Sequence, residues 1–399
     1  MSKIETDRSG KMRIPRAVYV LSGAVFVLGT SEFGIAGLLP EIATDLAVSL
    51  PSAGLLISAY AIAMVIGAPA LTVLTLRMPR RATLLGALGL FVAGQVLGAL
   101  AGDYLTLLVA RVVTAAATGA FWAASAAVVL SMVDPAHRGR ALSLQMGGLT
   151  LANVLGVPLG TLVGQQLGWR ATFWILAAGA ALAAMAIARA VADGQPHSAP
   201  TGIRAELREF TSGRLWLALG IIAVFQTAVM SCFSYLAPLI TEVAGFPAGV
   251  VPAALALFGV GSLIGVQVGG RLADAHPWAT LHLGLATVLL ALLALATAGA
   301  FGPVALAAAL LLGAAAFASA ASINARVFGL ASAAPRLAGA VSASAFNIGA
   351  TLGPWLGGIT ITAGWGFRAP SWLGAVLVAV ALGLALLSRA LDSRDRSDR

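Results

Sequence analysis

An acidic side chain lies in the middle of the first long apolar stretch of the sequence. In residues 17–39 Glu32 is the one charged residue, and the other polar side chains are the hydroxyls of Tyr19, Ser22, Thr30 and Ser31. A helix would place Glu32 roughly 22 Å from the start of this stretch, where an acid inside a membrane costs on the order of 2.5–3.5 kcal/mol. A proton or substrate site explains that cost; a structural acid paired with a neighbouring helix is the alternative. We favour the functional site because no other long apolar stretch holds an acid.

Signatures of several other chemistries are missing from the sequence. It has no HExxH pattern of a zinc protease and no GxxxxGK[ST] loop for ATP. Its single cysteine, Cys232, excludes an internal disulfide framework. We therefore expect no enzyme activity, no metal and no cofactor, with a proton gradient as the energy source. A membrane-embedded enzyme or sensor is the remote alternative.

Composition indicates a protein that crosses the membrane several times. Hydrophobic residues make up 59% of the 399 residues and charged residues only 10%, and a soluble domain of this size cannot bury so much apolar surface. The 24 lysines and arginines exceed the 15 acids and give a net charge of +9. Because these basic residues are sorted between connections, they indicate membrane topology and not a nucleic-acid partner.

Twelve apolar stretches are long enough to span a membrane as helices. They cover residues 17–39, 53–75, 82–101, 104–131, 141–164, 171–190, 214–238, 250–271, 279–299, 303–325, 338–361 and 371–388. Several are rich in Gly and Ala, which lets helix backbones approach closely. The sequence therefore predicts an all-α integral membrane protein with twelve transmembrane helices.

Basic residues gather on one side of these predicted helices. They precede the first helix and fill the even-numbered connections, the central polar segment and the C-terminal tail. On the opposite side the basic residues are Arg170 and Arg368. Cytoplasmic connections of membrane proteins carry the excess of Lys and Arg, so we expect both termini in the cytoplasm.

The two halves of the sequence share landmarks at a nearly constant spacing. Pro40 and Pro238 lie 198 residues apart (238 − 40), and each is expected to end the first helix of its half. Gly168-Trp169 and Gly364-Trp365 lie 196 residues apart (364 − 168). This register indicates a duplication. The predicted units are an N-terminal six-helix bundle at 1–190, a cytoplasmic linker at 191–213 and a C-terminal six-helix bundle with a cytoplasmic tail at 214–399.

Two motifs of the first half are short and specific: Gly156-Val157-Pro158-Leu159-Gly160, and Arg111 in Leu107-x-x-x-Arg111. They resemble the antiporter motif and the fourth-helix arginine of the major facilitator superfamily, in its twelve-helix drug:proton antiporter branch. The segments GTSEFGIAGLLPEIATDL, SYLAPLITEVAG and FNIGATLGP are similar to bacterial chloramphenicol exporters. LTLANVLGVPLGT is similar to arabinose and sugar efflux proteins.

This resemblance implies a fold of two pseudo-symmetric six-helix bundles and roles for several residues. Glu32 lies where the family often has its first-helix acid, and Arg111 is implied to take part in proton transfer. In the antiporter motif Gly156, Pro158 and Gly160 are implied to shape a bend and a close helix contact. The basic gating loop of the family is implied to correspond to Arg77, Arg80 and Arg81, with Asp274 at the equivalent place in the second half. Leu76 departs from the usual aspartate of that loop.

Glu32 and Arg111 have no counterparts in the second half, where Met230 and Ala308 stand at the equivalent positions. Packing symmetry would favour recurrence, so the asymmetry supports a function in the first half. Burial favours the neutral acid, whereas a nearby guanidinium favours the charged acid. A conformational change that alters their distance would therefore couple proton binding to transport. A purely structural arginine that caps backbone carbonyls is the alternative.

Other polar and aromatic residues within the apolar stretches are weaker candidates for substrate binding. The amides can bind a substrate or join helices, a structural role that contributes about 0.6–2 kcal/mol each and that we favour slightly. The amides are Asn153, Gln226 and Asn347. The aromatic residues can line a cavity, although ordinary packing is the better interpretation for any one of them. They are Tyr60, Phe121, Trp122 and Tyr235.

Together these observations predict a proton-coupled antiporter that exports small amphipathic compounds, chloramphenicol-like drugs first, across a bacterial inner membrane by alternating access. Arabinose or other sugar efflux and self-resistance to a secreted natural product are the alternatives. The expected partners are a small-molecule substrate, protons and the lipid bilayer, and no nucleic acid; we expect a monomer. With one intramembrane acid, exchange of a neutral drug for one proton is predicted to be electrogenic.

Overall fold

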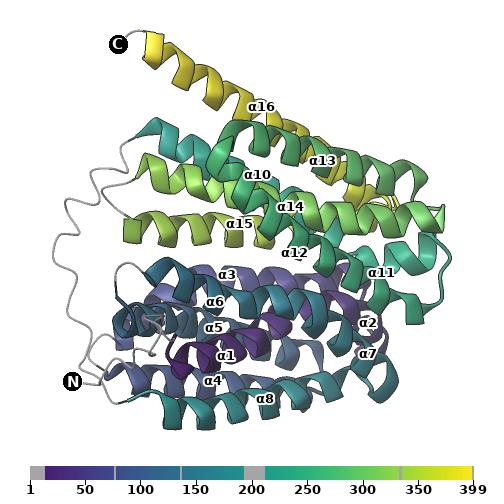
Figure 1. Ribbon diagram of the computed structural model, residues 1–399. Coiled ribbons are helices and arrows are strands. Elements are labelled where there is room, and N and C mark those ends of the chain that lie inside the picture. Colours follow the sequence, from purple (N-terminus) through teal and green to yellow (C-terminus); the bar gives the residue numbers. More distant parts are fainter. Residues whose placement is uncertain (1–13, 76–77, 135–136, 193–211, 332–334, 398–399) are drawn as a thin grey trace.

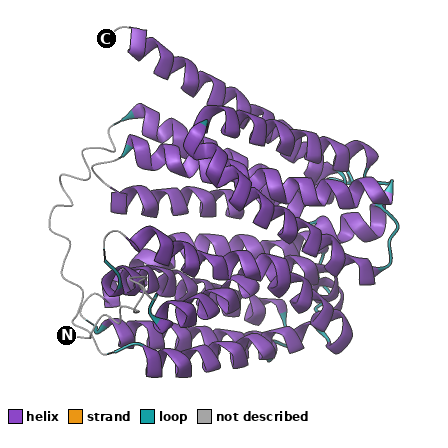
Figure 2. Cartoon of the chain, viewed as in Figure 1, coloured by secondary structure: helices purple, strands orange, loops and turns teal. Residues whose placement is uncertain are grey.

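The computed structural model describes residues 14–75, 78–134, 137–192, 212–331 and 335–397. Within these ranges the chain forms helices joined by short loops, and it contains no strand (Figure 2). The helices of the first half are α1 (Arg16–Gly34), α2 (Leu39–Asp45), α3 (Leu50–Thr75), α4 (Arg80–Ala99), α5 (Tyr104–Met132), α6 (Arg138–Leu151), α7 (Val157–Leu167) and α8 (Trp169–Ala190). Those of the second half are α10 (Gly213–Phe233), α11 (Leu236–Pro238), α12 (Val251–Ala275), α13 (Pro277–Ala298), α14 (Gly302–Leu330), α15 (Pro335–Thr362) and α16 (Ala369–Ser397).

Eleven helical segments of the described residues are long and apolar enough to cross a membrane. Two of them are interrupted: the 3₁₀ turn η1 (Ile35–Leu38) joins α1 to α2, and the π-helical turn η3 (Ala152–Gly156) joins α6 to α7. α15 is a further helix of 28 residues, less apolar because Gly, Ser and Thr recur along it. Each of the twelve predicted stretches thus contains a long helix.

The first helix ends earlier than predicted. The expectation that Pro40 terminates it is wrong, because α1 ends at Gly34 and Pro40 lies in the first turn of α2. Proline is tolerated there because the first N–H groups of a helix have no partner within the helix. The backbone therefore breaks two residues after Glu32, and this break shapes the site.

The helices pack mainly within their own half of the sequence. In the first half α3 and α4 pack on α5, while α1 packs on α6 and α8; in the second half α12 packs on α14, and α10 packs on α15 and α16. Figure 1 shows the two groups as a purple-to-teal layer and a green-to-yellow layer. Contacts between the groups come mainly from α3 with α15 and from α12 with η3 and α7. The unit boundaries near 191–213 fall largely outside the described residues and stay a prediction.

The two halves meet near one end of the molecule. α8 ends and α10 begins at the opposite end, which we call the linker end; the other is the far end (Figure 1). Towards the far end, Ser58 Oγ of α3 donates to the Thr351 carbonyl of α15 at 2.7 Å, and Gln165 Nε2 donates to the Ala248 carbonyl at 3.0 Å. One apolar core runs through residues 35–43 of the first half into the second half, whereas a separate core lies within the first half. Buried contacts thus join the halves at the far end.

Two local contacts hold individual helices in place: a cap at the start of α5, and a contact between α10 and α16. Asp103 caps α5, where its Oδ1 accepts from the Thr106 N–H at 2.9 Å; this bond holds the pKa of Asp103 below its usual value. In the second half the buried thiol of Cys232, on α10, lies 3.3 Å from Ser371 Oγ on α16. The cap starts the helix that carries Arg111.

Candidate functional site

Arg111 is almost fully buried on α5 and is bound to the end of α1. Its side chain is 1% exposed. Nη1 donates to the Ser31 carbonyl at 2.9 Å and to Ser31 Oγ at 3.3 Å, and Nη2 donates to the Glu32 carbonyl at 3.5 Å. A buried guanidinium needs such acceptors because its desolvation is otherwise very costly. The contacts tie α5 to the last turn of α1.

The break after α1 explains why these carbonyls are available. In a regular helix the Ser31 carbonyl would accept from the N–H of Ile35, four residues on. Here the Ile35 N–H is directed at the Phe33 carbonyl, because the chain tightens into η1. The unpaired carbonyls at a helix end need other donors, and the Arg111 guanidinium supplies them.

Tyr60 supports the same arginine from α3. The Arg111 Cζ lies 4.2 Å from the centroid of the Tyr60 ring, a cation–π arrangement. The Tyr60 hydroxyl is held in turn, since it donates to Thr118 Oγ1 at 2.8 Å. Tyr60 was predicted from the sequence as a candidate for substrate binding, and the structure places it against Arg111 with only 2% of its surface exposed.

Gln95 is part of the site, and the sequence analysis missed it. It is fully buried on α4, and its Nε2 donates to Ser31 Oγ at 2.6 Å. Ser31 Oγ therefore links the amide of Gln95 to the guanidinium of Arg111. A signal existed, because Gln95 is the one amide in the predicted stretch 82–101.

Glu32 differs from Arg111 because no described residue binds its side chain. Ser31 and Gly34 are buried, whereas Glu32 is half-buried. Its carboxyl group forms no hydrogen bond or ion pair with any described residue, and it interacts with Arg111 through space only. The direct contact with Arg111 goes through the backbone carbonyl of Glu32, which is the structural alternative considered for this arginine. The acid itself is left free to bind a proton or a ligand.

The antiporter motif lies on the bend of the helix that packs against α1. Val157 donates its N–H to the Ala152 carbonyl in the π-helical turn, and Pro158 lies in the first turn of α7. A Cβ on Gly156 would lie 1.9 Å from Thr30 Oγ1, so a larger residue there would force Thr30 or the backbone to shift. At Gly160 the nearest atom would be 3.4 Å away, an ordinary contact. The close approach of the two helices therefore depends on Gly156. Its neighbour Thr30 lies on α1, two residues before Glu32.

The three candidate amides form no hydrogen bond with one another among the described residues. Asn153 is buried, and its Nδ2 lies 3.4 Å from the Leu149 carbonyl of the same helix. Half-buried Asn347 donates to the Ala343 carbonyl at 3.0 Å, again within one helix. Gln226 is half-buried, and its side chain has no hydrogen-bond partner among the described residues. The structure therefore shows no interhelical bond formed by these amides.

The other aromatic candidates are packing residues in this conformation. Phe121 is 0% exposed in the core of the first half, and Trp122 packs partly buried against the same core. Tyr235 is 1% exposed, and its hydroxyl donates to the Pro354 carbonyl at 2.8 Å. Its hydroxyl also fills the space beside Gly54 of the opposite half.

The predicted gating residues are only partly described. Arg81 donates from Nη2 to the Ala188 carbonyl of α8, and Arg80 begins α4. Arg77 and the side chain of Asp274 lie outside the described residues, so the predicted charge contact between the loops stays a prediction. No group of three or more His, Cys, Asp or Glu side chains gathers within the described ranges.

Comparisons with known proteins agree with this architecture. The family model of the Major Facilitator Superfamily matches residues 21–344. A chloramphenicol resistance protein of Streptomyces lividans is 39% identical over 382 residues, covering 95% of this chain and 97% of the relative. The inner membrane transport protein YdhP of Escherichia coli K12 is 34% identical, with 94% and 97% covered. The putative transporter AraJ of the same strain is 30% identical, with 93% and 94% covered.

A solved structure shows the same fold at low identity. It is a bacterial homologue of the human lysosomal transporter Spinster, in an inward-facing and unoccupied conformation. The TM-score is 0.72 at 16% identity, with 94% of this chain and 96% of the other covered. Two layers of membrane-spanning helices, a family match over most of the sequence and full-length relatives all lead to one assignment. The chain belongs to the Major Facilitator Superfamily.

Proposed function

We propose that this transporter exports small amphipathic compounds, chloramphenicol-like drugs first, in exchange for protons. The observation that carries the proposal is Glu32, a half-buried acid with no partner among the described residues, next to the buried cation Arg111. An intramembrane acid of this kind is suited to alternate between a proton and a substrate. The chloramphenicol resistance protein of Streptomyces lividans, 39% identical, supports the substrate class.

The proposed orientation has the linker end and both termini in the cytoplasm of a bacterial cell. The excess of basic residues at this end supports it. Since the halves are joined at the far end, the conformation is then closed towards the outside. Alternating access requires that this closure be released when the cytoplasmic side closes.

The acid lies next to a contact between the halves, which supports coupling. Phe33, the residue after Glu32, meets Phe233 of the second half edge-to-face with ring centroids 6.5 Å apart. Arg111 holds the backbone of α1 at the same turn. Movement of the second half away from Phe33 would therefore alter the surroundings of Glu32, and with them its tendency to hold a proton.

The test is growth of an efflux-deficient bacterium on a panel of chloramphenicol, other amphipathic antibiotics and arabinose analogues. Cells would express the wild type, Glu32→Gln or Glu242→Gln, an exposed far-end acid that serves as the matched control. Equal membrane expression would be verified for all three. We expect the wild type and Glu242→Gln to protect against phenicols, and Glu32→Gln to lose that protection.

Protection that survives Glu32→Gln would remove this acid from the mechanism. Wild-type protection against arabinose analogues alone would favour sugar efflux. Protection against no compound of the panel would contradict the proposed substrate class.

A further inference from the structure

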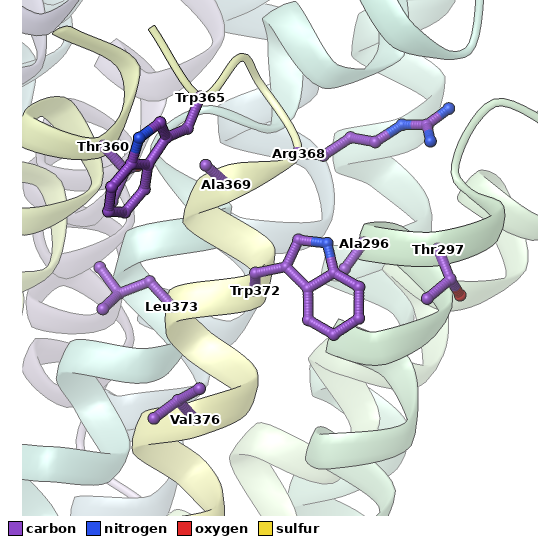
Figure 3. Close-up of a pocket in the computed structure, with 9 residues that line it drawn as sticks. All are labelled: Ala296, Thr297, Thr360, Trp365, Arg368, Ala369, Trp372, Leu373 and Val376. Atoms are coloured by element: carbon purple, nitrogen blue, oxygen red, sulfur yellow. The ribbon is translucent and has the colours of Figure 1, made fainter. Parts of the chain in front are cut away.

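A groove opens at the far end of the second half, away from Glu32. It has a volume of about 800 Å³ and lies between the end of α13 and the start of α16, with the end of α15 beside it. Figure 3 shows Arg368 and the indoles of Trp365 and Trp372 around it, with Val376 further along α16. The cation and the indoles thus lie at one end of the groove and the apolar Val376 lies at the other, while Thr297 and Thr360 also line it.

Arg368 is the one charged side chain that lines the groove. Its side chain forms no ion pair and no hydrogen bond with the described residues. The two indoles beside it are open to the surroundings, with 71% of Trp365 and 47% of Trp372 exposed. An unpaired cation at the edge of a membrane protein attracts an anion from outside.

The first half contains the same sequence pattern with its arginine fully engaged. Arg-Ala-x-x-Trp occurs at Arg170 and again at Arg368, 198 residues later (368 − 170), the spacing of Pro40 and Pro238. Arg170 Nη1 pairs with Asp45 Oδ2 at 2.5 Å and Nη2 donates to the Ala101 carbonyl at 2.7 Å.

In the second half the internal acid is absent. The position 198 residues after Asp45 holds Val243, next to the exposed Glu242. Arg368 therefore has no acid at the position equivalent to Asp45. Arg170 contacts Asp45, whereas Arg368 lines an open groove. This difference between the halves indicates that the charge of Arg368 serves a ligand.

The remaining lining specifies the chemistry of that ligand. Arg368 directly precedes α16, and Val376 lies on that helix eight residues later. This spacing places Val376 about 12 Å further into the proposed membrane. Ala296 of α13 and Leu373 of α16 line the same groove and are also apolar. α16 begins at the mouth, and the positive end of its dipole favours an anion. An anionic head group above an acyl chain matches this order, and tryptophans are typical of that depth.

We propose that this groove binds one anionic phospholipid, with the phosphate at Arg368, the glycerol region against Trp365 and Trp372, and an acyl chain along Val376. The site is separate from the transport site, and its test does not depend on any transported substrate.

The test is the thermal stability of the purified, delipidated protein after addition of phosphatidylglycerol, phosphatidylcholine or inorganic phosphate. The variants are Arg368→Gln, Trp372→Ala and Arg389→Gln. Arg389 is the matched control, because it is an exposed arginine at the other end of the same helix. We expect phosphatidylglycerol to raise the Tm of the wild type and of Arg389→Gln. In Arg368→Gln the loss of one arginine contact should weaken lipid binding, so the half-saturating lipid concentration should rise about fivefold.

Each further outcome decides the proposal. Equal Tm without lipid for Arg368→Gln and the wild type supports it, because this arginine binds no described residue whose contact would be lost. An unchanged lipid response in Arg368→Gln would overturn it. So would an equal response to phosphatidylcholine, which lacks the net negative charge, or a full response to inorganic phosphate, which has no acyl chain. Retained lipid response in Trp372→Ala would remove the groove from the binding site.

Discussion

At the scale of single residues, the candidate site combines Arg111, which binds backbone carbonyls, with Glu32, whose carboxyl group no described residue binds. Arg111 has acceptors on Ser31 and Glu32 and an aromatic face at Tyr60. Its Nε is buried and has no hydrogen-bond partner among the described residues, so the guanidinium is held through its two terminal nitrogens. Glu32 contacts Arg111 through its backbone carbonyl and not through its carboxyl group. The arginine therefore fixes the backbone at the acid, and the acid can change its charge while the backbone is kept in place.

The geometry at Arg111 predicts that its shape matters as well as its charge. In Arg111→Lys one ammonium cannot reach both carbonyls in the same way as the forked guanidinium. Loss of one charge-assisted hydrogen bond, about 1.5–3 kcal/mol, should lower transport by at least about tenfold. Drug transport in inverted membrane vesicles, normalised to the amount of protein, measures this effect.

Arg189→Lys is the control, since Arg189 is exposed and donates within its own helix, to the Met185 carbonyl. This variant should transport at the wild-type rate. Wild-type transport in Arg111→Lys would show that charge alone is required.

At the scale of elements, two interrupted helices pack against each other where the site is built. The 3₁₀ turn after α1 frees the carbonyls that bind Arg111, and the π-helical turn before α7 brings Gly156 onto Thr30. π-Helical turns are frequent at functional sites because they re-aim side chains within a helix. Here both irregularities lie within the same pair of helices.

This packing predicts opposite outcomes for two glycines of one motif. Gly156→Ala would place a methyl group 1.9 Å from Thr30 Oγ1, whereas Gly160→Ala meets nothing closer than 3.4 Å. Overpacking of this kind typically costs about 1–3 kcal/mol. We expect a lower Tm and reduced transport for Gly156→Ala, and wild-type values for Gly160→Ala, measured by thermal unfolding in detergent and by vesicle transport.

A compensating change sharpens that comparison. Thr30→Ala removes the hydroxyl that clashes, so the double variant with Gly156→Ala should recover part of the lost Tm. Equal stability of Gly156→Ala and Gly160→Ala would contradict the close approach of α1 to η3.

At the scale of the whole molecule, the halves are joined at the far end, while Glu32, the acid we propose for proton coupling, lies in the first half. Their shared apolar core includes residues 35–43 beside the break in α1. A single acid without a counterpart in the second half predicts exchange of one proton for each neutral drug. Such a cycle moves one net charge across the membrane.

The charge balance predicts that voltage drives export. In proteoliposomes without a pH gradient, a potential of 100 mV is worth about 2.3 kcal/mol for each charge moved, enough for about a fiftyfold gradient of a neutral drug. Uptake of a phenicol should therefore respond to a potassium diffusion potential and reverse with its sign. A wild-type protein that transports equally at all potentials would rule out exchange of one proton.

The sequence was sufficient to predict the long helices of the described residues. It also singled out Glu32 and Arg111, whose roles stay predictions, because membrane depth makes charged residues conspicuous. Apolar stretches predicted every long helix, and Glu32 stood out as the one acid among them. The contacts of Arg111 could not be predicted, because they depend on a backbone break at Gly34 that no proline marks. Gln95 was overlooked for a related reason, since its bond to Ser31 joins residues 64 positions apart.

The single thiol of the chain has a practical consequence. Cys232 is buried where α10 meets α16, and buried thiols react slowly with labelling reagents. A cysteine introduced at an exposed position would thus be the main site of modification without prior removal of the native residue. Paired spectroscopic probes on α3 and α15 can then report how the distance between the halves changes during turnover in an otherwise native sequence.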